Sequence, residues 1–589
     1  MFKKSALLSM TLIVVFLATM VGCAPAEAPT AEVIEVERQV EVTKIVEVEG
    51  EKEIITETIT EIVTATPAAE VEVDKYGGTF YWGMPDEFPG FNPVMNDAYV
   101  ELYLFGMNAE PLTWGGENYP TILEPILAES WEVSEDGKVW TIHLREGVLW
   151  HDGVEFTSED VVFWAEAIQH PDTEKTEWLK PRFSSGGVDH KFEAIDKYTV
   201  QVTTEEVVSS MLNLICVPLF PKHLVEDVEF LDLASHPSNT DGNMGTGPFK
   251  MIEYKRGEAV ILEAFEDHWR GKPYLDGMVL REITDPQAMV AAVKNGEVDW
   301  ARVDPSVVPQ LLGVEGIEIE IIKMDSWRGL HINNKKPFFA DKRIRQAMMY
   351  GLDRQAIVDT YLMGYGSIPD FPFTYAVDAY KNFGGLPQYE HDPAKALELL
   401  AEVGWEMGAD GVLVANGVEG VADGTRFEDI LNAYPTVASI ATVIQSNLAE
   451  IGMDLTIEIM EWSVWTGENL AVEDKPYSLM ISGGGWLGSD ASGYSWAYFA
   501  GAAKDSHDNY FNQEVQDLFD QSMAEPDRDK SAEYIYELSQ ILWDELPLLP
   551  LAWASWIFAK SERLHIEEAG LDPALFAMFT YPEKIWVEK

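Results

Sequence analysis

The chain has 589 residues, more than one hydrophobic core usually organises, so at least two globular lobes are expected. Hydrophobic residues make up 47% and charged residues 24% of it, which is typical of a folded globular protein and excludes a membrane bundle or a fully disordered chain. A formal charge of −59 excludes partners that are themselves polyanions, above all nucleic acids.

The first 22 residues have the pattern of a bacterial export signal. Lys3 and Lys4 precede an apolar stretch from about Ala6 to Met20, followed by Val21, Gly22 and Cys23. A small residue before a lone cysteine resembles the lipobox of bacterial lipoproteins, which implies cleavage after Gly22 and acylation of Cys23. A retained membrane anchor is the alternative, and either interpretation places the body outside the cytoplasm.

Residues 23–75 would then be an acylated cysteine and a spacer of low complexity. Valine and glutamate alternate in VEVTKIVEVEGEKEII, and the stretch has no aromatic residue that could form a core. Alternation favours an extended strand over a helix, yet a lone strand has no partner. We interpret it as a spacer, with a stalk that pairs with another copy as the alternative.

From Tyr76 onward, short strands and amphipathic helices are mixed, which predicts an α/β fold. The predicted strands are GGTFYWGM, KVWTIHL and TVQVTT, and the predicted helices are 159–168, 344–356, 393–403, 436–451 and 527–543. Apart from Cys23, Cys216 is the only cysteine, so no disulfide is expected in the processed chain. Cys216 is expected to be a small residue of the core.

One segment, Leu127 to Trp164, has the sequence LAESWEVSEDGKVWTIHLREGVLWHDGVEFTSEDVVFW. Trp140, Ile142 and Leu144 alternate as one face of a strand, and Thr157 or Ser158 is placed to cap the helix that follows. By periodicity alone this is a hairpin and a helix.

As a string, this segment resembles the signature of the extracellular solute-binding proteins of family five, the oligopeptide, dipeptide and nickel-binding group of ABC importers. Six further segments follow in the family's order: GTGPFKMIEY, DHWRGKPYLDGMVLREITD, KNGEVDW, LHINNKKPFFADKRIRQAMMYGLDRQAIV, HDPAKALELLAEVGW and DELPLLPL. Together they span about Gly77 to Ile566, nearly the whole exported body.

The resemblance implies a two-lobed periplasmic-binding-protein-like fold with an extra N-terminal subdomain, of the class II type in cluster C. Its lobes would be joined by crossing strands near Ile283 and Leu551. Lobe I would comprise 76–283 plus 552–589, and lobe II 284–551. It also implies a non-enzymatic, monomeric substrate-binding lipoprotein without a cofactor. Held by its lipid at the outer face of the cytoplasmic membrane, it would pass a ligand to ABC permease subunits.

Family members that take peptides use a lobe II aspartate, shortly after a Gly-Trp pair, to neutralise the peptide's amino group. The matching stretch here is GGGWLGSDASGYSWAYF, Gly483 to Phe499, and Asp490 is the expected residue. A carboxylate in a dry cleft strongly favours an ammonium partner. Asp490 lies one position later than the family's spacing, where Ser489 stands, and the customary Asp-Pro that follows is absent.

Aromatic residues gather near the same stretch and are predicted to line the cleft. They are Trp462, Trp465, Trp486, Tyr494 and Trp496, with Trp327 before the LHINN strand as a weaker candidate. Flat indole rings also stack on sugars, so an oligosaccharide ligand on the same scaffold is the second hypothesis. Core packing is the competing role for each tryptophan.

Other site classes find little support in the sequence. The eleven histidines are dispersed without metal-ligand spacing, so no metal site is expected. We predict no catalytic residues, although a glycosidase using a pair of acidic residues and a purely structural envelope protein remain as alternatives from other classes.

Overall fold

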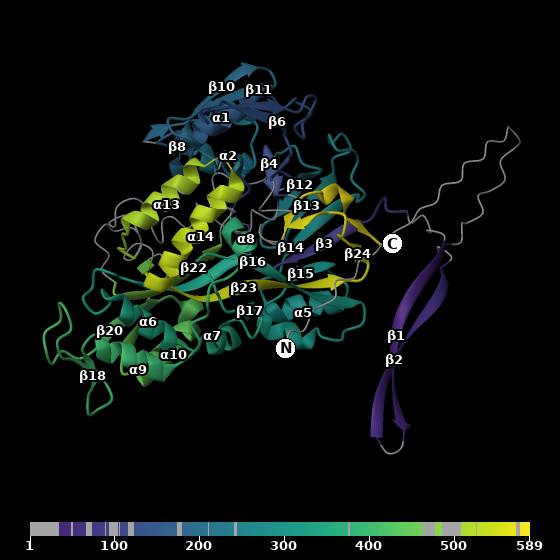
Figure 1. The fold of residues 1–589 in the computed structure, drawn as a ribbon. Helices are drawn as coiled ribbons and strands as arrows, with labels where there is room; N and C mark the ends of the chain where they lie inside the picture. The colour runs from purple at the N-terminus through teal and green to yellow at the C-terminus, as the bar shows by residue number, and fades with distance from the viewer. Residues whose placement is uncertain are drawn as a thin grey trace, which may run out of the picture. The chain divides into compact units, whose positions relative to one another are not determined.

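A computed structural model gives the structure of the chain, and Figure 1 shows its fold. It describes residues 34–48, 51–65, 74–88, 90–92, 104, 106–115, 123–173, 180–185, 187–209, 211–240, 244–374, 377–461, 464–465, 477–485, 508–525, 527–572 and 578–589. The chain divides into two compact units, Met1–Asp74 and Lys75–Lys589. Among the described residues, no helix combines the length and the apolar character that crossing a membrane requires.

The first unit contains an antiparallel hairpin of two 15-residue strands, β1 (Ile34–Val48) and β2 (Glu51–Ala65). They pair in continuous register from Ile34 opposite Ala65 to Val48 opposite Glu51. The alternating stretch is therefore extended, as its β-branched residues predict, and its partner strand comes from the same chain.

In the second unit, a small subdomain carries the Leu127 to Trp164 segment. Its four-stranded antiparallel sheet has the order β10 (Lys191–Asp196), β11 (Thr199–Thr203), β7 (Val139–Leu144) and β6 (Ala128–Val133). Trp140, Ile142 and Leu144 are buried on one face of β7, as the alternation predicts. Helix α1 (Ser158–Gln169) packs on this sheet, and the N–H of its N-cap residue Thr157 donates to Asp160 at 2.9 Å.

The remaining long strands form one large mixed sheet, which Figure 1 shows running through the body. In spatial order its strands are β12 (Phe249–Lys255), β13 (Ala259–Ala264), β14 (Gly277–Glu282), β3 (Thr79–Met84), β15 (Trp300–Arg302), β23 (Leu548–Ser561), β16 (Ile317–Ile332), β22 (Leu479–Gly485), β20 (Glu428–Ala433) and β21 (Asp454–Ile459), with β17 (Gly366–Ser367) also paired to β23. β3 runs parallel to β14 and β15, and β20 runs parallel to β21 and β22. The sheet thus has one parallel group toward each end.

Two long antiparallel strands, β16 and β23, join these groups and pass between two separate hydrophobic cores. Along β16, Met324 belongs to the first core and Trp327 to the second. Along β23, Trp553 belongs to the second core and Phe558 to the first. The chain therefore changes from one packed body to the other near residues 325 and 555.

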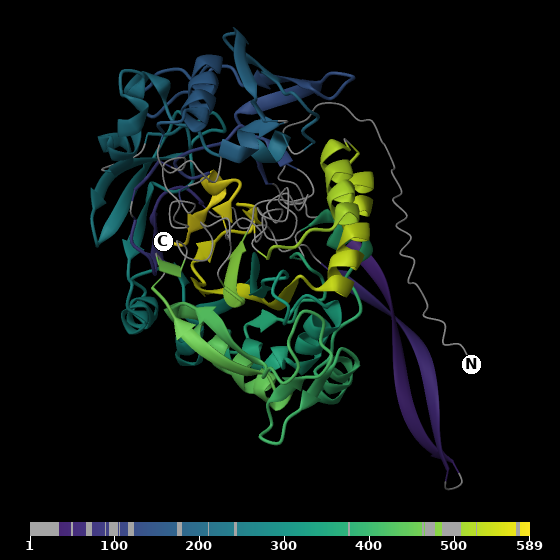
Figure 2. The same ribbon diagram turned by 90° about the vertical axis from the view of Figure 1, so that its left-hand side faces the viewer.

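The longer helices cover the sheet and the cores, and Figure 2 shows α13 and α14 as an antiparallel pair. The helices that cover the sheet and the cores are α5 (Pro286–Lys294), α6 (Lys342–Gly351), α7 (Arg354–Tyr361), α8 (Asp378–Phe383), α9 (Pro393–Glu402), α10 (Ala438–Glu450), α13 (Gln513–Ala524) and α14 (Arg528–Glu545). The helices predicted at 159–168, 393–403, 436–451 and 527–543 are confirmed within about two residues at each end.

The single helix predicted over 344–356 is wrong, because the chain forms α6 and α7 there with a break between them. Leu352 is extended, and the Asp353 side chain accepts a hydrogen bond from the N–H of Ala356 at 2.9 Å. Aspartate satisfies the free N–H groups of a helix start so well that it begins a new helix here.

Short elements complete the second unit. They are β4 (Thr113–Gly115), β5 (Leu123–Pro125), β8 (Ser184–Ser185), β9 (Val188–Asp189), β18 (Trp405–Met407), β19 (Leu413–Ala415), β24 (Leu564–His565), β25 (Leu571–Asp572), β26 (Met578–Phe579), β27 (Trp586–Val587), α2 (Met211–Leu214), α3 (Lys222–Val225) and α4 (Pro237–Thr240). Cys216 is buried in the first core, as expected of a small core residue.

Candidate functional site

The carboxyl ends of the two parallel strand groups meet where β16 and β23 change cores. Met84 and Arg302 end β3 and β15, and Arg302 lies opposite Phe558 of β23. On the other side β22 ends at Gly485, opposite Ser326 of β16. Ligands of open α/β sheets bind outside the carboxyl ends of the strands, so this junction is the candidate binding cleft.

On the first side of the junction, a charged pair lies against a tryptophan. The Arg302 guanidinium donates to the carboxylate of Asp86, two residues after β3, with N and O 2.6 Å apart. The same guanidinium lies 4.5 Å from the ring centre of Trp556. Arg302 thereby fixes both the chain leaving β3 and an indole of the crossing strand.

On the second side, β16 and β22 approach closely because β22 ends in three glycines. A Cβ atom on Gly483 would lie 2.3 Å from the carbonyl oxygen of Trp327 and 2.7 Å from the side chain of Arg328. The Nε of Arg328 donates to the hydroxyl of Tyr361 at 3.1 Å. The close packing of β16 and β22 therefore requires glycine at position 483.

The LHINN motif at the end of β16 holds the chain just before β22 and at residue 508. Its Asn333 donates through Nδ2 to the carbonyl of Tyr477 at 3.1 Å. Its Asn334 donates to the carbonyl of Asp508 at 2.9 Å from both the backbone N–H and the side-chain Nδ2. The motif thus fixes the entry into β22 and the chain at residue 508.

A buried polar chain links the same strands. Ser482 Oγ lies 2.6 Å from His331 Nε2, and His331 Nδ1 lies 2.9 Å from Asp508 Oδ1. Burial raises the pKa of the Asp508 carboxyl, and the His331 imidazole partly opposes this rise.

The order of groups is that of a serine hydrolase, but their setting is a protein interior. Ser482 is 6% exposed within β22, and His331 and Asp508 are fully buried. A nucleophile has to reach its substrate, so we assign this network to holding β16, β22 and the residue 508 region together. The sequence gives no local signal for it, since its members lie 151 and 177 positions apart.

In the first lobe, Glu110 joins the GTGPF and DHWRG motifs. Its carboxylate accepts hydrogen bonds from Thr246 Oγ1 at 2.9 Å, His268 Nε2 at 3.2 Å, Trp269 Nε1 at 3.1 Å and Arg270 Nη2 at 2.9 Å. Burial alone raises the pKa of Glu110, but His268 and Arg270 outweigh it and lower the pKa to about 2.

His151 of the HDG turn contacts the GTG sequence as well. Its Nε2 lies 2.9 Å from the carbonyl oxygen of Gly247, and the N–H of Gly245 donates to its Nδ1. Burial lowers the pKa of His151 to about 4. A Cβ on Gly245 would lie 1.9 Å from the carbonyl oxygen of Asn108, which explains the glycine at this position.

The structure describes two of the predicted ligand-binding residues, and both are core residues in this conformation. Trp465 is fully buried and packs edge-on against Tyr434, with ring centres 5.2 Å apart. Trp327 is 5% exposed and lies opposite Trp553 across β16 and β23. A binding role for either stays a prediction.

The other predicted site residues lie outside the described residues. They are Cys23, Trp462, Trp486, Asp490, Tyr494 and Trp496. The stretch with Asp490 follows directly after the carboxyl end of β22, which is the edge that faces the junction. Sequence reasoning missed Asp86, Arg302 and Trp556, for which the Trp-Ala-Ser-Trp run of β23 is the available signal.

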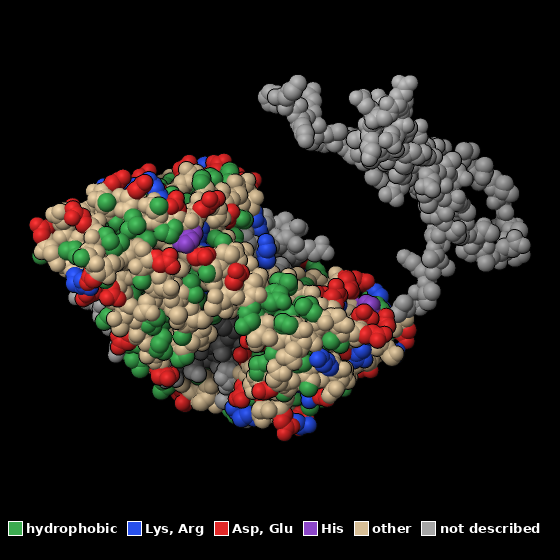
Figure 3. Space-filling view, turned by 90° about the horizontal axis from the view of Figure 1, so that it is seen from below, with side chains coloured by type: hydrophobic (Ala, Val, Ile, Leu, Met, Phe, Trp, Pro, Cys, Tyr) green, Lys and Arg blue, Asp and Glu red, His purple; other side chains and the backbone are tan. Residues whose placement is uncertain are grey.

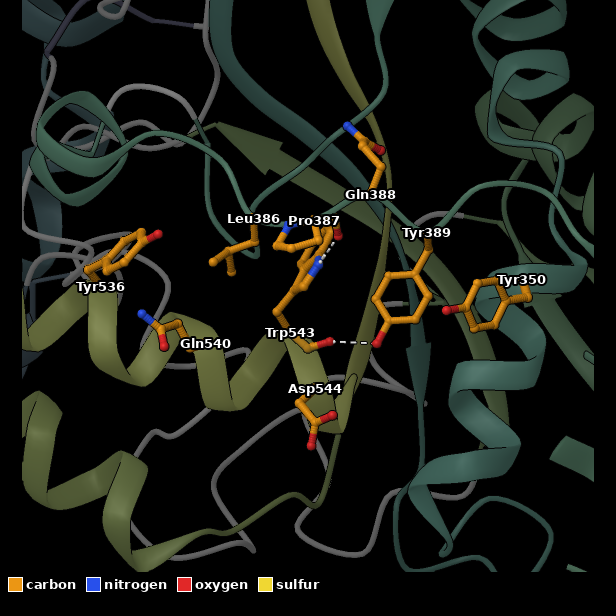
Figure 4. Close-up of a pocket in the computed structure, with 9 residues that line it drawn as sticks. All are labelled: Tyr350, Leu386, Pro387, Gln388, Tyr389, Tyr536, Gln540, Trp543 and Asp544. Carbon is orange, nitrogen blue, oxygen red and sulfur yellow. Dashed lines mark hydrogen bonds between the residues drawn. The ribbon is translucent and has the colours of Figure 1, made fainter. Parts of the chain in front are cut away.

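A pocket of about 520 Å³ lies away from this junction, between α14, α6 and the loop that follows α8. Figure 4 shows Tyr350 and Tyr389 side by side and Trp543 beneath Pro387. Trp543 Nε1 donates to the carbonyl of Pro387 at 2.9 Å, and the Tyr389 hydroxyl donates to the carbonyl of Trp543 at 3.1 Å. These donors are occupied within the protein, so we do not assign a ligand to this pocket.

Known proteins are similar to this chain in sequence and in fold. Over 343 residues the chain is 30% identical to the oligopeptide-binding protein AppA of Bacillus subtilis, covering 57% of this chain and 61% of AppA. Over 462 residues it is 27% identical to the dipeptide-binding protein of Escherichia coli, covering 73% and 80% of the two chains.

The structure of AppA from Bacillus subtilis in complex with a nonapeptide superposes with a TM-score of 0.69 and 25% identity. The superposition covers 88% of this chain and 100% of AppA. Residues 123–506 match the family described as bacterial extracellular solute-binding proteins, family 5 Middle. The two-lobed α/β fold and the family expected from the seven motifs are therefore confirmed. The chain belongs to the bacterial extracellular solute-binding proteins of family 5.

Proposed function

We propose that this protein captures peptides outside the cytoplasm between two closing lobes and delivers them to an ABC permease. The observation that carries the proposal is the meeting of both parallel strand groups at the crossing of β16 and β23. A ligand held there touches both lobes, so its binding favours their closure. The names of AppA and of the Escherichia coli relative favour a peptide over an oligosaccharide ligand.

The lobes meet, in this proposal, near residues 325 and 555. We propose a crossing near residue 325 in place of the one expected at Ile283, because α5 and β15 pack with β3 and the end of β23. The expected crossing at Leu551 moves by only a few residues along β23. Lobe I then includes residues 284–324, which the sequence-based division placed in lobe II.

Asp490 is the proposed partner of the peptide's amino group. It comes five residues after Gly485 in the sequence, and Gly485 is the last residue of β22. Trp486, Tyr494, Trp496 and Trp462 are proposed to line the same cleft. Trp327 and Trp465 would act by packing behind it, because both are buried.

The location of the protein outside the cytoplasm is proposed from the N-terminal sequence pattern. Cleavage after Gly22 and acylation of Cys23 would anchor the chain at the outer face of the cytoplasmic membrane. Residues 24–75 would hold the body clear of the lipid. The protein would work as a monomer without a cofactor or chemistry of its own, and it would hand the ligand to the permease subunits.

Calorimetric titration of the protein with one nonapeptide, in free and N-acetylated form, tests the amine-recognition step. We expect Asp490→Asn to weaken binding of the free peptide at least about 30-fold, because a desolvated ammonium loses its counter-charge. N-acetylation should cost a similar factor, and the two changes together should cost little more than either alone. Asp454→Asn, which changes an exposed aspartate at the start of β21, serves as the matched control and should leave affinity unchanged.

Equal loss in both variants, or none in either, would sink the role of Asp490. Binding of oligosaccharides in place of peptides, with a larger loss from Trp486→Ala than from Asp490→Asn, would favour the sugar hypothesis. A product released from the bound ligand at enzyme-like rates would overturn the assignment as a binding protein.

A further inference from the structure

The extra subdomain and the second lobe contact each other far from the crossing strands. Ser209 lies between β11 and α2 of the first lobe, and Met523 lies near the end of α13 of the second. The Ser209 hydroxyl donates to the carbonyl oxygen of Met523 at 2.6 Å, and the Ser209 backbone N–H donates to the same oxygen at 3.2 Å. In Figure 1, α13 lies beside α2.

Each partner is fixed to a different hydrophobic core. On one side, Val208 and Met211 pack into the first core. On the other, Val515 of α13 and Ile535 of α14 are buried in the second core, and the Ser531 hydroxyl donates to the carbonyl of Ser522 at 2.9 Å. The contact therefore joins segments that are packed into two different hydrophobic cores.

The acceptor is chemically suited to such a contact. Met523 is the second-last residue of α13, and the last carbonyl groups of a helix have no partner within the helix. Ser209 offers both its hydroxyl and its N–H to the Met523 carbonyl oxygen. That oxygen therefore needs no hydrogen-bond donor from the second lobe. When the lobes separate, water has to replace both donors.

We propose that Ser209 and the Met523 carbonyl form a latch through which the extra subdomain stabilises the closed form of the protein. Because the two bodies are joined elsewhere by β16 and β23, the latch can form only when they close on each other. It contributes free energy to the closed state alone and so raises the affinity for any ligand that needs closure. This inference rests on the proposed capture between two lobes, but it adds a role for the subdomain that is independent of ligand class.

The test compares Ser209→Ala with Ser531→Ala in the full-length protein. Both variants remove one serine hydroxyl that donates to a carbonyl near the end of α13, but only Ser209 reaches across the lobes. The first readout is deuterium uptake over residues 205–212, and the second is affinity for a library of nonapeptides with free amino termini. We expect Ser209→Ala to increase the uptake and to weaken binding about fivefold, as loss of one such hydrogen bond implies. Ser531→Ala should leave both readouts unchanged.

Each outcome decides something different. Unchanged uptake and affinity in Ser209→Ala, or equal changes in both variants, would overturn the latch. If the wild-type protein binds none of the peptides but uptake over 205–212 still rises in Ser209→Ala, the latch stands and the peptide assignment fails. Peptide binding by the wild type with no effect of Ser209→Ala would leave the proposed function intact and remove the latch.

Discussion

At the scale of single residues, Glu110 shows how a buried charge can be retained. A carboxylate without water is costly, yet Glu110 accepts hydrogen bonds from four side chains, including those of His268 and Arg270. These partners come from the GTGPF and DHWRG motifs, so one carboxylate ties together two motifs that lie 136 or more positions from it. The family motifs of this lobe therefore have a structural reason that does not involve the ligand.

We predict that Glu110→Gln lowers the free energy of unfolding at pH 7 by about 3 kcal/mol, the equivalent of a pKa lowered from 4.5 to about 2. Because the folded-state pKa lies below the unfolded value, the stabilisation is present above pH 4.5 and is lost as the pH falls toward 2. The difference between wild type and variant should shrink over that window. Urea unfolding at a series of pH values measures it.

Glu146→Gln, which changes an exposed carboxylate of the same lobe, is the matched control. It should alter the free energy of unfolding by less than about 0.5 kcal/mol. A constant difference between wild type and Glu110→Gln from pH 7 to 3 would refute the ionised, hydrogen-bonded state of Glu110.

At the scale of elements, the ends of strands and helices decide where the cleft can lie. β22 reaches the junction because its glycines let it lie close to Trp327 and Arg328 of β16. The LHINN motif holds the chain before β22 and at residue 508. Backbone packing thus fixes the strand after which the proposed ligand-binding segment follows.

Gly483→Ala tests this close approach. The added methyl would lie 2.3 Å from the Trp327 carbonyl oxygen, so β22 must move, and we expect a loss of about 1–3 kcal/mol in the free energy of unfolding. Gly257→Ala is the comparison, because its φ of +73° is unfavourable for alanine but no atom lies within 4 Å of the new methyl. It should cost about 1 kcal/mol. A smaller loss at Gly483 than at Gly257, measured by urea unfolding, would argue against tight β16–β22 packing.

At the scale of the whole molecule, the formal charge of −59 works against the compact state. On the face shown in Figure 3, acidic side chains are spread over the surface rather than gathered in one patch. Acidic residues lie on both sides of the contact between the subdomain and the second lobe. Glu205 and Glu206 are near Ser209, and Glu525 is near Met523. Repulsion between like charges is therefore distributed over the molecule, and at this contact the ion pair of Glu525 with Lys530 reduces it.

We predict that sodium chloride stabilises this protein. Raising its concentration from about 0.01 M to about 1 M shortens the screening length from about 30 Å to about 3 Å and weakens the repulsion. The urea midpoint should rise over this range. Sodium chloride is preferred to a sulfate salt, which stabilises proteins by exclusion from their surface. A midpoint that falls or stays constant would mean that the ion pairs lost to screening matter more than the net charge.

Local features of the structure were predictable from sequence because they depend on neighbouring residues. The buried face of Trp140, Ile142 and Leu144, the capped start of α1 after Thr157 and the α/β class all follow from periodicity and capping. The break between α6 and α7 differs from the single helix predicted over 344–356, because the Asp353 side chain caps a new helix start.

By itself, the sequence determined the fold class, the family and the stretch after β22 in which the ligand partner is expected, since each is encoded in contiguous residues. The tertiary structure decided that Trp327 and Trp465 are buried, and that Glu110, His331 and Ser209 find partners more than a hundred positions away. Such pairs form when strands and helices pack, and the order of residues along the chain carries no local signal for them.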